Sequence, residues 1–139
     1  MIINGDKVMV GATQSPANAF IFCGELVAAT TTAVGGVLKL QNTYGLDLIV
    51  TDVLFDITTE STGAATLDVG VDDGGDTSND TLFDALDVNT AAGLFNAHKN
   101  AGTNGKHNVV WKEDEYIVAT ASATVAGLVG NYKIFAIAR

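Results

Sequence analysis

Hydrophobic and polar residues alternate along the middle of the chain with the two-residue period of a β-strand. In the segment 46–59, the odd positions from Ile49 to Ile57 form one mostly apolar face, and the even positions from Leu48 to Asp56 form a mixed face. The segment 66–71 alternates more cleanly, with three leucine and valine side chains on one face. Both segments therefore predict half-buried strands.

Five further runs are rich in Val, Ile, Phe, Tyr and Thr, the residue types that favour pleated and half-buried strands. Clusters of Gly, Asn, Asp and Ser separate the runs and predict turns. No long helix is expected, because the best helical candidate, residues 81–97, contains Gly93 and β-branched residues; we interpret it as a short turn or a strand pair. The five runs are Phe20–Ala28, Val37–Gln41, Val109–Trp111, Tyr116–Ser122 and Tyr132–Ala138.

About eight short strands with such turns predict an all-β fold, an antiparallel β-sandwich that is jelly-roll-like. The 139 residues suit a single sandwich domain, which we place at residues 19–139. Residues 1–18 are low in charge, contain the only proline, Pro16, and precede the first strong strand. They are expected to form an extended N-terminal arm that contacts a neighbouring subunit, although chain ends are commonly frayed.

Several strands carry apolar residues on both faces, whereas a sandwich strand normally buries one face and exposes the other to water. The second apolar face needs cover, either from another copy of the chain or from the chain's own arm and loops. We expect a homo-oligomer. The residues predicted to mediate self-association are Phe20, Phe22, Leu26, Leu48, Val50, Leu54, Phe135 and Ile137.

The formal net charge is −9, and the charge is unevenly distributed. Eleven acidic residues and no Lys or Arg lie between Leu40 and His98, whereas the rest of the chain carries seven bases and five acids. The acidic balance argues against nucleic acid and anionic membranes as partners, because both are bound through Lys and Arg. The asymmetry suits association in which an acidic flank of one copy faces a basic flank of the next. A solvated acidic face that keeps the protein soluble explains it equally well.

The ends and the cysteine content bear on the cellular compartment. The N-terminus lacks a basic stretch followed by an apolar one, so no secretory signal is expected. No stretch approaches the roughly 20 apolar residues of a membrane-spanning helix. Cys23, the one cysteine, cannot form an intrachain disulfide, and its place within a strand predicts a small buried side chain. These features predict a soluble protein made in the cytosol, which stays there or is assembled from it.

The sequence contains none of the common catalytic motifs, such as H-E-x-x-H, G-x-S-x-G or C-x-x-C. His98 and His107, the only histidines, fall in a region rich in Asn, Gly and Lys and are interpreted as solvent-exposed. The segment 102–107 superficially resembles a phosphate-binding loop but is two residues short between its glycines, so Asn104-Gly105 is better explained as a tight turn. We therefore expect a protein that is not an enzyme and needs no cofactor.

The best small-ligand candidate is the acidic loop at residues 72–80. Clustered oxygens suit a hard cation such as calcium, but the spacing misses the EF-hand pattern and lacks the closing glutamate, so a solvated hairpin loop is the alternative. A carbohydrate site would need exposed aromatic rings, and Trp111, beside Val109 and Val110, is more readily explained as a core residue. The weak metal-ligand candidates are Asp72, Asp73, Asp76 and Asp80.

Short stretches of the sequence resemble segments that recur in small virion structural proteins of tailed bacteriophages. The longest is residues 56–71, and residues 119–130 resemble the C-terminal hairpin of the same group. The resemblance covers roughly residues 46–138. It implies a jelly-roll-like sandwich, commonly trimeric, that decorates or cements a capsid or else builds part of the tail or a fibre. The shorter matching stretches are residues 80–82, 87–88, 90–95 and 102–106.

From the residues and this resemblance we expect a capsid decoration (cement) protein, a homotrimer that stabilises the head by cross-bridging capsid subunits. Such an oligomer gains avidity because its second contact with the capsid is effectively intramolecular. Its expected partners are itself and the major capsid protein, and its expected location is the virion, after assembly in the host cytoplasm. Two other functions stay open: a tail- or fibre-associated module that binds a host glycan, and a calcium-dependent binding domain.

Overall fold

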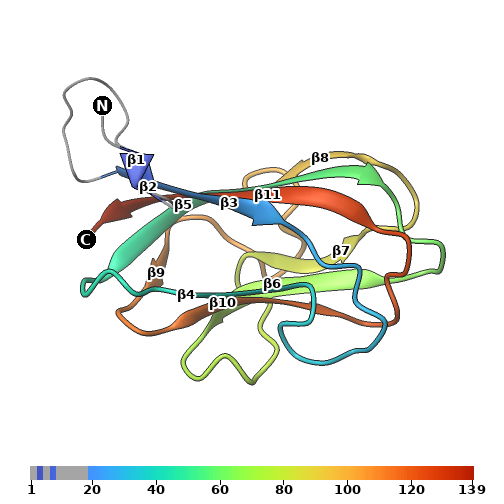
Figure 1. Cartoon of the computed structure of the whole chain (residues 1–139), viewed down its shortest axis with the longest axis horizontal. Helices are drawn as coiled ribbons and strands as arrows, with labels where there is room; N and C mark the ends of the chain where they lie inside the picture. Colours follow the sequence, from blue (N-terminus) through green and yellow to red (C-terminus); the bar gives the residue numbers. More distant parts are fainter. Residues whose placement is uncertain (1–2, 5–6, 9–18) are drawn as a thin grey trace.

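Two antiparallel β-sheets, packed face to face, make up residues 19–139 of the computed structural model (Figure 1). The structure describes these residues and, by their backbone alone, residues 3–4 and 7–8. Residues 19–139 contain nine strands and no helix. The prediction of an all-β antiparallel sandwich is therefore confirmed.

Each sheet is named here after one of its central strands. The β5 sheet has the order β3-β11-β5-β8, with the short β9 also paired to β5, and the β10 sheet has the order β4-β10-β6-β7. The strands of the β5 sheet are β3 (Ala19–Glu25), β11 (Val129–Ala138), β5 (Leu48–Thr59), β8 (Gly93–Asn96) and β9 (Val109–Trp111). Those of the β10 sheet are β4 (Leu38–Gln41), β10 (Tyr116–Ala121), β6 (Thr66–Asp72) and β7 (Phe83–Asp87).

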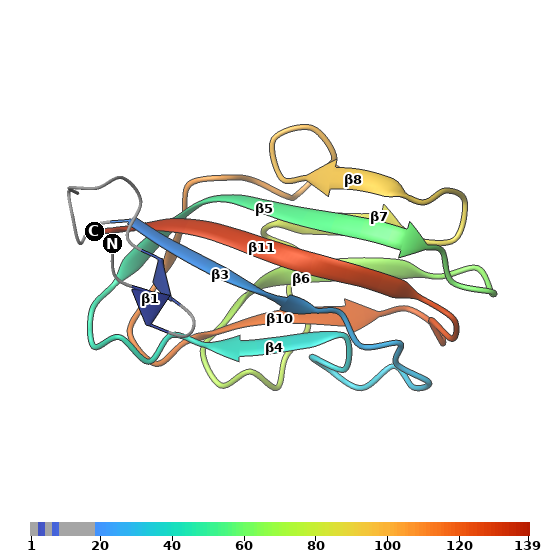
Figure 2. The same ribbon diagram turned by 45° about the horizontal axis from the view of Figure 1, so that its top comes forward.

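The chain passes from one sheet to the other at most of its connections (Figure 2). Among the nine strands, only β6 and β7 are consecutive in sequence and hydrogen-bonded to each other. The first strands instead pair with the last ones, β3 with β11 and β4 with β10. The pairing of strands from the two ends of the chain is thus nested, β4 with β10 inside β3 with β11.

The seven strand segments predicted from the sequence all occur, with their ends shifted by a few residues. Residues 81–97 contain two strands, as the strand-pair interpretation proposed, but β7 pairs with β6 and β8 pairs with β5. The segment is thus a crossover between the sheets and not a hairpin. The strands β1 (Ile3–Asn4) and β2 (Lys7–Val8) pair with each other, and β2 contacts β3. The rest of the predicted arm, residues 1–18, lies outside the described residues.

A β-bulge in β5 changes which positions of that strand point into the core. Ala136 of β11 pairs with Val50, and the preceding Phe135 pairs with Asp52, so Thr51 is the extra residue. The side chains before the bulge face the core from even positions, and those after it do so from odd positions. The expectation of one apolar face along the odd positions is therefore wrong. The buried residues of β5 are Leu48, Val50, Val53, Phe55 and Ile57.

The core lies between the sheets and is built from aliphatic and aromatic side chains. Trp111 is fully buried, as expected, and its ring lies edge-on to Phe22 with centroids 5.2 Å apart. Phe55 and Phe83 join the two sheets across the core, with ring centroids also 5.2 Å apart. Burying a side chain of this size contributes about 1.5–3 kcal/mol each, so these contacts between the sheets dominate the stability of the fold.

Asn42 is a buried polar residue that fastens the turn after β4 to the end of β9. Its side-chain amide donates hydrogen bonds to the carbonyl oxygens of Leu46, Trp111 and Lys112, at 2.9, 3.0 and 3.1 Å. Its Oδ1 accepts a hydrogen bond from the backbone N–H of Tyr44 at 3.1 Å. The buried amide is therefore satisfied on both its nitrogen and its oxygen.

The loop between β6 and β7 covers part of the outer face of the β10 sheet. Gly70 and Val118 are paired across β6 and β10 and so share this face. A Cβ on Gly70 would lie 2.2 Å from Oδ1 of Asn79, so the loop packs directly on the glycine backbone. Val118 is fully buried although it does not belong to the core between the sheets. Here the chain covers its own second apolar face, the alternative to cover by another copy.

Candidate interaction site

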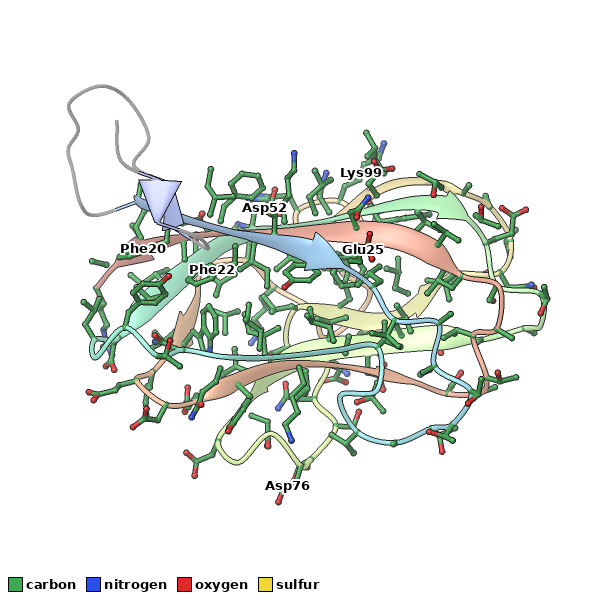
Figure 3. The ribbon with its side chains drawn as sticks, viewed as in Figure 1. Phe20, Phe22, Glu25, Asp52, Asp76 and Lys99 are labelled. Atoms are coloured by element: carbon green, nitrogen blue, oxygen red, sulfur yellow. The ribbon has the colours of Figure 1, made fainter. Side chains whose placement is uncertain are left out.

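Five of the eight residues predicted to mediate self-association lie in the core of a single copy. They are buried side chains packed between the sheets, so they do not offer a surface to a second copy. Figure 3 shows Phe20 and Phe22 beneath β3, on the side that faces the other sheet. Alternation shows that the two faces of a strand differ, but it does not show which face lies inside. Self-association would need these residues of β3 on its outer face, whereas they lie on its inner face. The five are Phe20, Phe22, Leu26, Leu48 and Val50.

The other three, Leu54, Phe135 and Ile137, lie on the outer face of the β5 sheet. Leu54 and Phe135 are half-buried and Ile137 is 42% exposed. Phe135 is paired with Ile21, so the two side chains share this face. The outer face of the β5 sheet therefore carries an apolar surface near the start of β3. Self-association through these three residues stays a prediction.

A groove of about 470 Å³ lies farther along the same face, where its character is mixed. Leu54 and Leu94 contribute apolar surface, and Leu94 is 66% exposed. Lys133, Glu25 and Asp56 add one cation and two carboxylates (Glu25 is labelled in Figure 3). The remaining lining residues are Cys23, Gly24, Asn131 and Tyr132. Such a groove can receive an apolar side chain flanked by charged groups.

Cys23 lines this groove, and its side chain is exposed, contrary to the expectation of a buried thiol. The alternation along β3 does not show which of its two faces lies inside, so the exposure of Cys23 could not be predicted. Phe20 and Phe22 point into the core, so Cys23, the next residue of the strand, points outward.

Two carboxylates of the acidic loop at residues 72–80 are used in hydrogen bonds within the molecule. Asp72 accepts hydrogen bonds from the backbone N–H groups of Asp76 and Thr77, at 3.0 and 3.3 Å. Asp80 accepts a hydrogen bond from Nδ2 of Asn104 at 3.0 Å. Within residues 19–139, no group of three His, Cys, Asp or Glu side chains is placed to hold a metal ion. The four candidates Asp72, Asp73, Asp76 and Asp80 thus gain no support as calcium ligands.

The aromatic side chains give no platform for a sugar ring in residues 19–139. Trp111 and four of the six phenylalanines are buried, and the other two phenylalanines and the three tyrosines are half-buried. Sugar stacking requires a ring face open to solvent. The glycan-binding alternative therefore lacks the exposed aromatic that would distinguish it.

Both histidines lie on the surface and stack on each other, a contact that the sequence analysis did not foresee. The rings of His98 and His107 have centroids 3.9 Å apart and planes inclined by 24°. Nε2 of His98 donates a hydrogen bond to the carbonyl oxygen of Thr51 at 3.1 Å and lies 4.0 Å from Oδ1 of Asp52. The β-bulge at Thr51 therefore fixes the first ring.

The two histidines and two lysines line a second hollow of about 440 Å³, which we call the basic pocket. Its side chains are those of His98, Lys99, Lys106 and His107, all of which are exposed. The loop is held in place by backbone hydrogen bonds from Lys106 to Thr81 and from Asp84 to Ala101, both at 2.8 Å. The pocket offers positive charge to an anionic group.

Asp87 is committed to the turn that follows β7. The hydroxyl of Thr90 and the backbone N–H groups of Asn89 and Thr90 donate hydrogen bonds to its carboxylate and hold its pKa below the usual value. Hydrogen bonding favours the ionised form of the carboxyl group. Asp87 therefore stabilises the crossover from β7 to β8.

Comparison with known proteins gives one structural likeness and no relative by sequence. No family model and no characterised protein matches the chain, and the described residues form no helix that could cross a membrane. Among solved structures, the chain is similar to one from the "Acidic stable capsid structure of Helicobacter pylori bacteriophage KHP30". The TM-score is 0.54 and the identity 13%, over 87% of this chain and 88% of that chain. The chain thus shares its fold with a chain of that phage capsid structure.

Proposed function

We propose that this chain is a non-enzymatic structural protein of a bacteriophage particle. The observation that carries the proposal is the likeness in fold, over 87% of the chain, to a chain of a phage capsid structure. The short sequence stretches that resemble phage virion proteins point the same way. The surface features of residues 19–139 are also those of a contact protein, namely a mixed groove, a basic pocket and an apolar outer face.

Within that class, the role that we propose is capsid decoration. The chain acts as an oligomer, proposed to be a homotrimer, that bridges subunits of the major capsid protein on the virion. Exposed apolar residues such as Leu94 and Ile137 are available for contacts with a partner. Each contact is modest, but a symmetric oligomer makes several at once, so the assembled bridge is much stronger than one contact.

Electron cryomicroscopy of purified particles tests the proposal. The expected result is density for the sandwich at symmetry-related positions on the outside of the head. Particles that lack the chain altogether would overturn the structural role. Density confined to the tail or to fibres would overturn the decoration role and favour the tail alternative.

We also propose that the N-terminal arm, residues 1–18, is the contact with the capsid lattice, and this gives a second and sharper test. Deleting residues 1–16 is expected to leave a folded oligomer with an unchanged number of subunits that no longer sediments with particles. Circular dichroism and light scattering check the fold and the mass, and co-sedimentation measures loading. The full-length chain is the positive control, and Glu60→Gln, a change at an exposed site outside the arm, is the matched variant. Normal loading of the truncated chain would show that the arm is not the particle contact.

A further inference from the structure

One lysine of the basic pocket and one carboxylate of the acidic loop lie on opposite sides of the sandwich. Figure 3 shows Lys99 beyond the β5 sheet and Asp76 beyond the β10 sheet. Lys99 belongs to the basic pocket, and Asp76 lies in the acidic loop at residues 72–80. The base of the acidic loop touches the loop of the pocket within one copy, because Asp80 accepts a hydrogen bond from Asn104. Lys99 and the loop tip at Asp76 lie on opposite sides, so a pairing between these two requires a second copy.

The cations of the basic pocket are available to a partner. Among the described residues, Arg139 forms an ion pair with Asp47 and His98 lies 4.0 Å from Asp52, and neither contact includes Lys99 or Lys106. The pocket holds two of the seven Lys and Arg residues and both histidines of a chain whose net charge is −9. It is thus a cluster of basic side chains on an acidic molecule, with the carboxylate of Asp52 4.0 Å from His98.

The tip of the acidic loop is also exposed, with the Lys39 side chain of the same copy packed beside Gly75. Asp72 is used within the loop and Asp80 is bound to Asn104, but Asp73 and Asp76 are exposed. Neither Asp73 nor Asp76 belongs to an ion pair among the described residues. The loop is anchored by its packing on Gly70, so these two carboxylates are presented on a fixed support.

We propose that the basic pocket of one copy binds the Asp73 and Asp76 side of the acidic loop of a second copy. The two surfaces differ, so the contact is head-to-tail and leads to a closed ring or a filament. Exposed ion pairs are individually weak, so the isolated contact is weak and gains strength from repetition in the assembly. This inference deepens the proposed structural role and rests on it for its purpose.

The salt dependence of self-association separates this contact from the effect of net charge. Copies that each carry −9 repel one another, and salt weakens that repulsion, so association without a specific charged contact increases with salt. The pocket and loop attract over the short distance of an ion pair, and salt weakens that attraction. We expect sedimentation to show association at 0.15 M NaCl that decreases towards 1 M. A chain that is monomeric throughout, or whose association increases with salt, would overturn the proposal.

Two neutralising variants identify the surfaces. Lys99→Gln with Lys106→Gln removes the lysine charges of the pocket, and Asp73→Asn with Asp76→Asn removes those of the loop. Each variant is expected to raise the dissociation constant about tenfold, as the loss of two exposed ion pairs does. The loop variant is decisive because it reduces the net negative charge of the chain from −9 to −7. If repulsion between copies dominates, this variant should associate better than the unmodified chain.

The controls carry the same charge changes outside the two surfaces. Lys112→Gln with Arg139→Gln matches the pocket variant, and Glu60→Gln with Glu113→Gln matches the loop variant. Both controls should associate as the unmodified chain does. Control variants that lose association to the same extent would overturn the proposed pairing.

Mixing the two variants tests the direction of the contact. The intact loop of the pocket variant can still bind the intact pocket of the loop variant. The altered pocket of the first variant and the altered loop of the second have no partner. The mixture is therefore expected to form a complex of two copies and nothing larger, measured by light scattering. No complex in the mixture would overturn the head-to-tail contact.

Loss of particle loading by the pocket variant with unchanged self-association would also overturn it, and would identify an acidic surface of the particle as the occupant. The purified chain can show no head-to-tail association while it is still found in particles. Failure of this inference is therefore distinguishable from failure of the proposed function.

Discussion

Replacing Asn42 by Ala should remove a large part of the stability of this fold. The change removes the two N–H groups that are shared among three backbone carbonyls, and the oxygen that accepts a backbone N–H. A typical hydrogen bond contributes about 1 kcal/mol net and an unpaired buried polar group costs more, so the loss is about 3–4 kcal/mol. Domains are stable by only about 5–15 kcal/mol, so the variant is expected to fold but to be strongly weakened.

Urea denaturation followed by tryptophan fluorescence measures this loss. Trp111 is the only tryptophan, is fully buried, and has its backbone carbonyl bonded to Asn42, so its emission reports directly on this region. With a slope near 2 kcal/mol per M, the midpoint should fall by about 1.5–2 M without a change in slope. Asn131→Ala, at an exposed position of β11, should change the midpoint little.

Asn42→Asp separates the donated bonds from simple packing. The side chain keeps its size, but a carboxylate oxygen then faces carbonyl oxygens that received N–H groups. The variant should therefore be at least as unstable as Asn42→Ala at pH 7 and should recover partly in acid, where the carboxyl group is protonated. A loss below about 1 kcal/mol for Asn42→Ala would refute the assignment of these bonds as a main support of the fold.

Three further changes test other parts of the structure. Asp87→Ala should destabilise the chain at pH 7; because the folded pKa of Asp87 is lowered, its contribution is full above the unfolded value of about 3.9 and is lost as the pH falls through the folded pKa. Urea midpoints that differ equally at pH 7 and in acid below the folded pKa would contradict this. Gly70→Ala should displace the acidic loop, cost about 1–3 kcal/mol and speed hydrogen exchange at Val118, and unchanged exchange would count against the packing. Ile137→Lys should leave the urea midpoint nearly unchanged but weaken self-association or particle loading if the outer face is a contact; an unchanged result in both assays removes Ile137 from the interface.

The strands could be predicted from the sequence because a period of two is a local property of the chain. The segment around Leu67, for example, alternates strongly enough to define its strand, and the segment around Ile134 does so through its content of β-branched and aromatic residues. The turns could be predicted for the same reason, since Gly, Asn and Asp act on the backbone next to them. Local chemistry thus accounts for the sandwich and for most of its strand boundaries.

The direction of each strand face could not be predicted, because it depends on distant partners. In β3, Phe22 and Ile21 are both apolar, and only the packing of Phe22 against Trp111 makes its side the inner one. The same limitation led five core residues to be assigned to self-association. Asn42 gave no signal either, since a polar residue beside a turn is normally exposed.

The basic pocket arises from the irregularity of β5, which no local pattern indicated. The bulge at Thr51 lies between the part of β5 that pairs with β9 and the part that pairs with β8. It leaves the Thr51 carbonyl free to accept the hydrogen bond from His98, and it places Asp52 where it accepts one from the backbone N–H of Ala97, at 3.2 Å. One extra residue therefore both changes the buried face of β5 and anchors the start of the loop that carries the histidines and lysines. The fold and its candidate contact surface depend on the same local feature of the backbone.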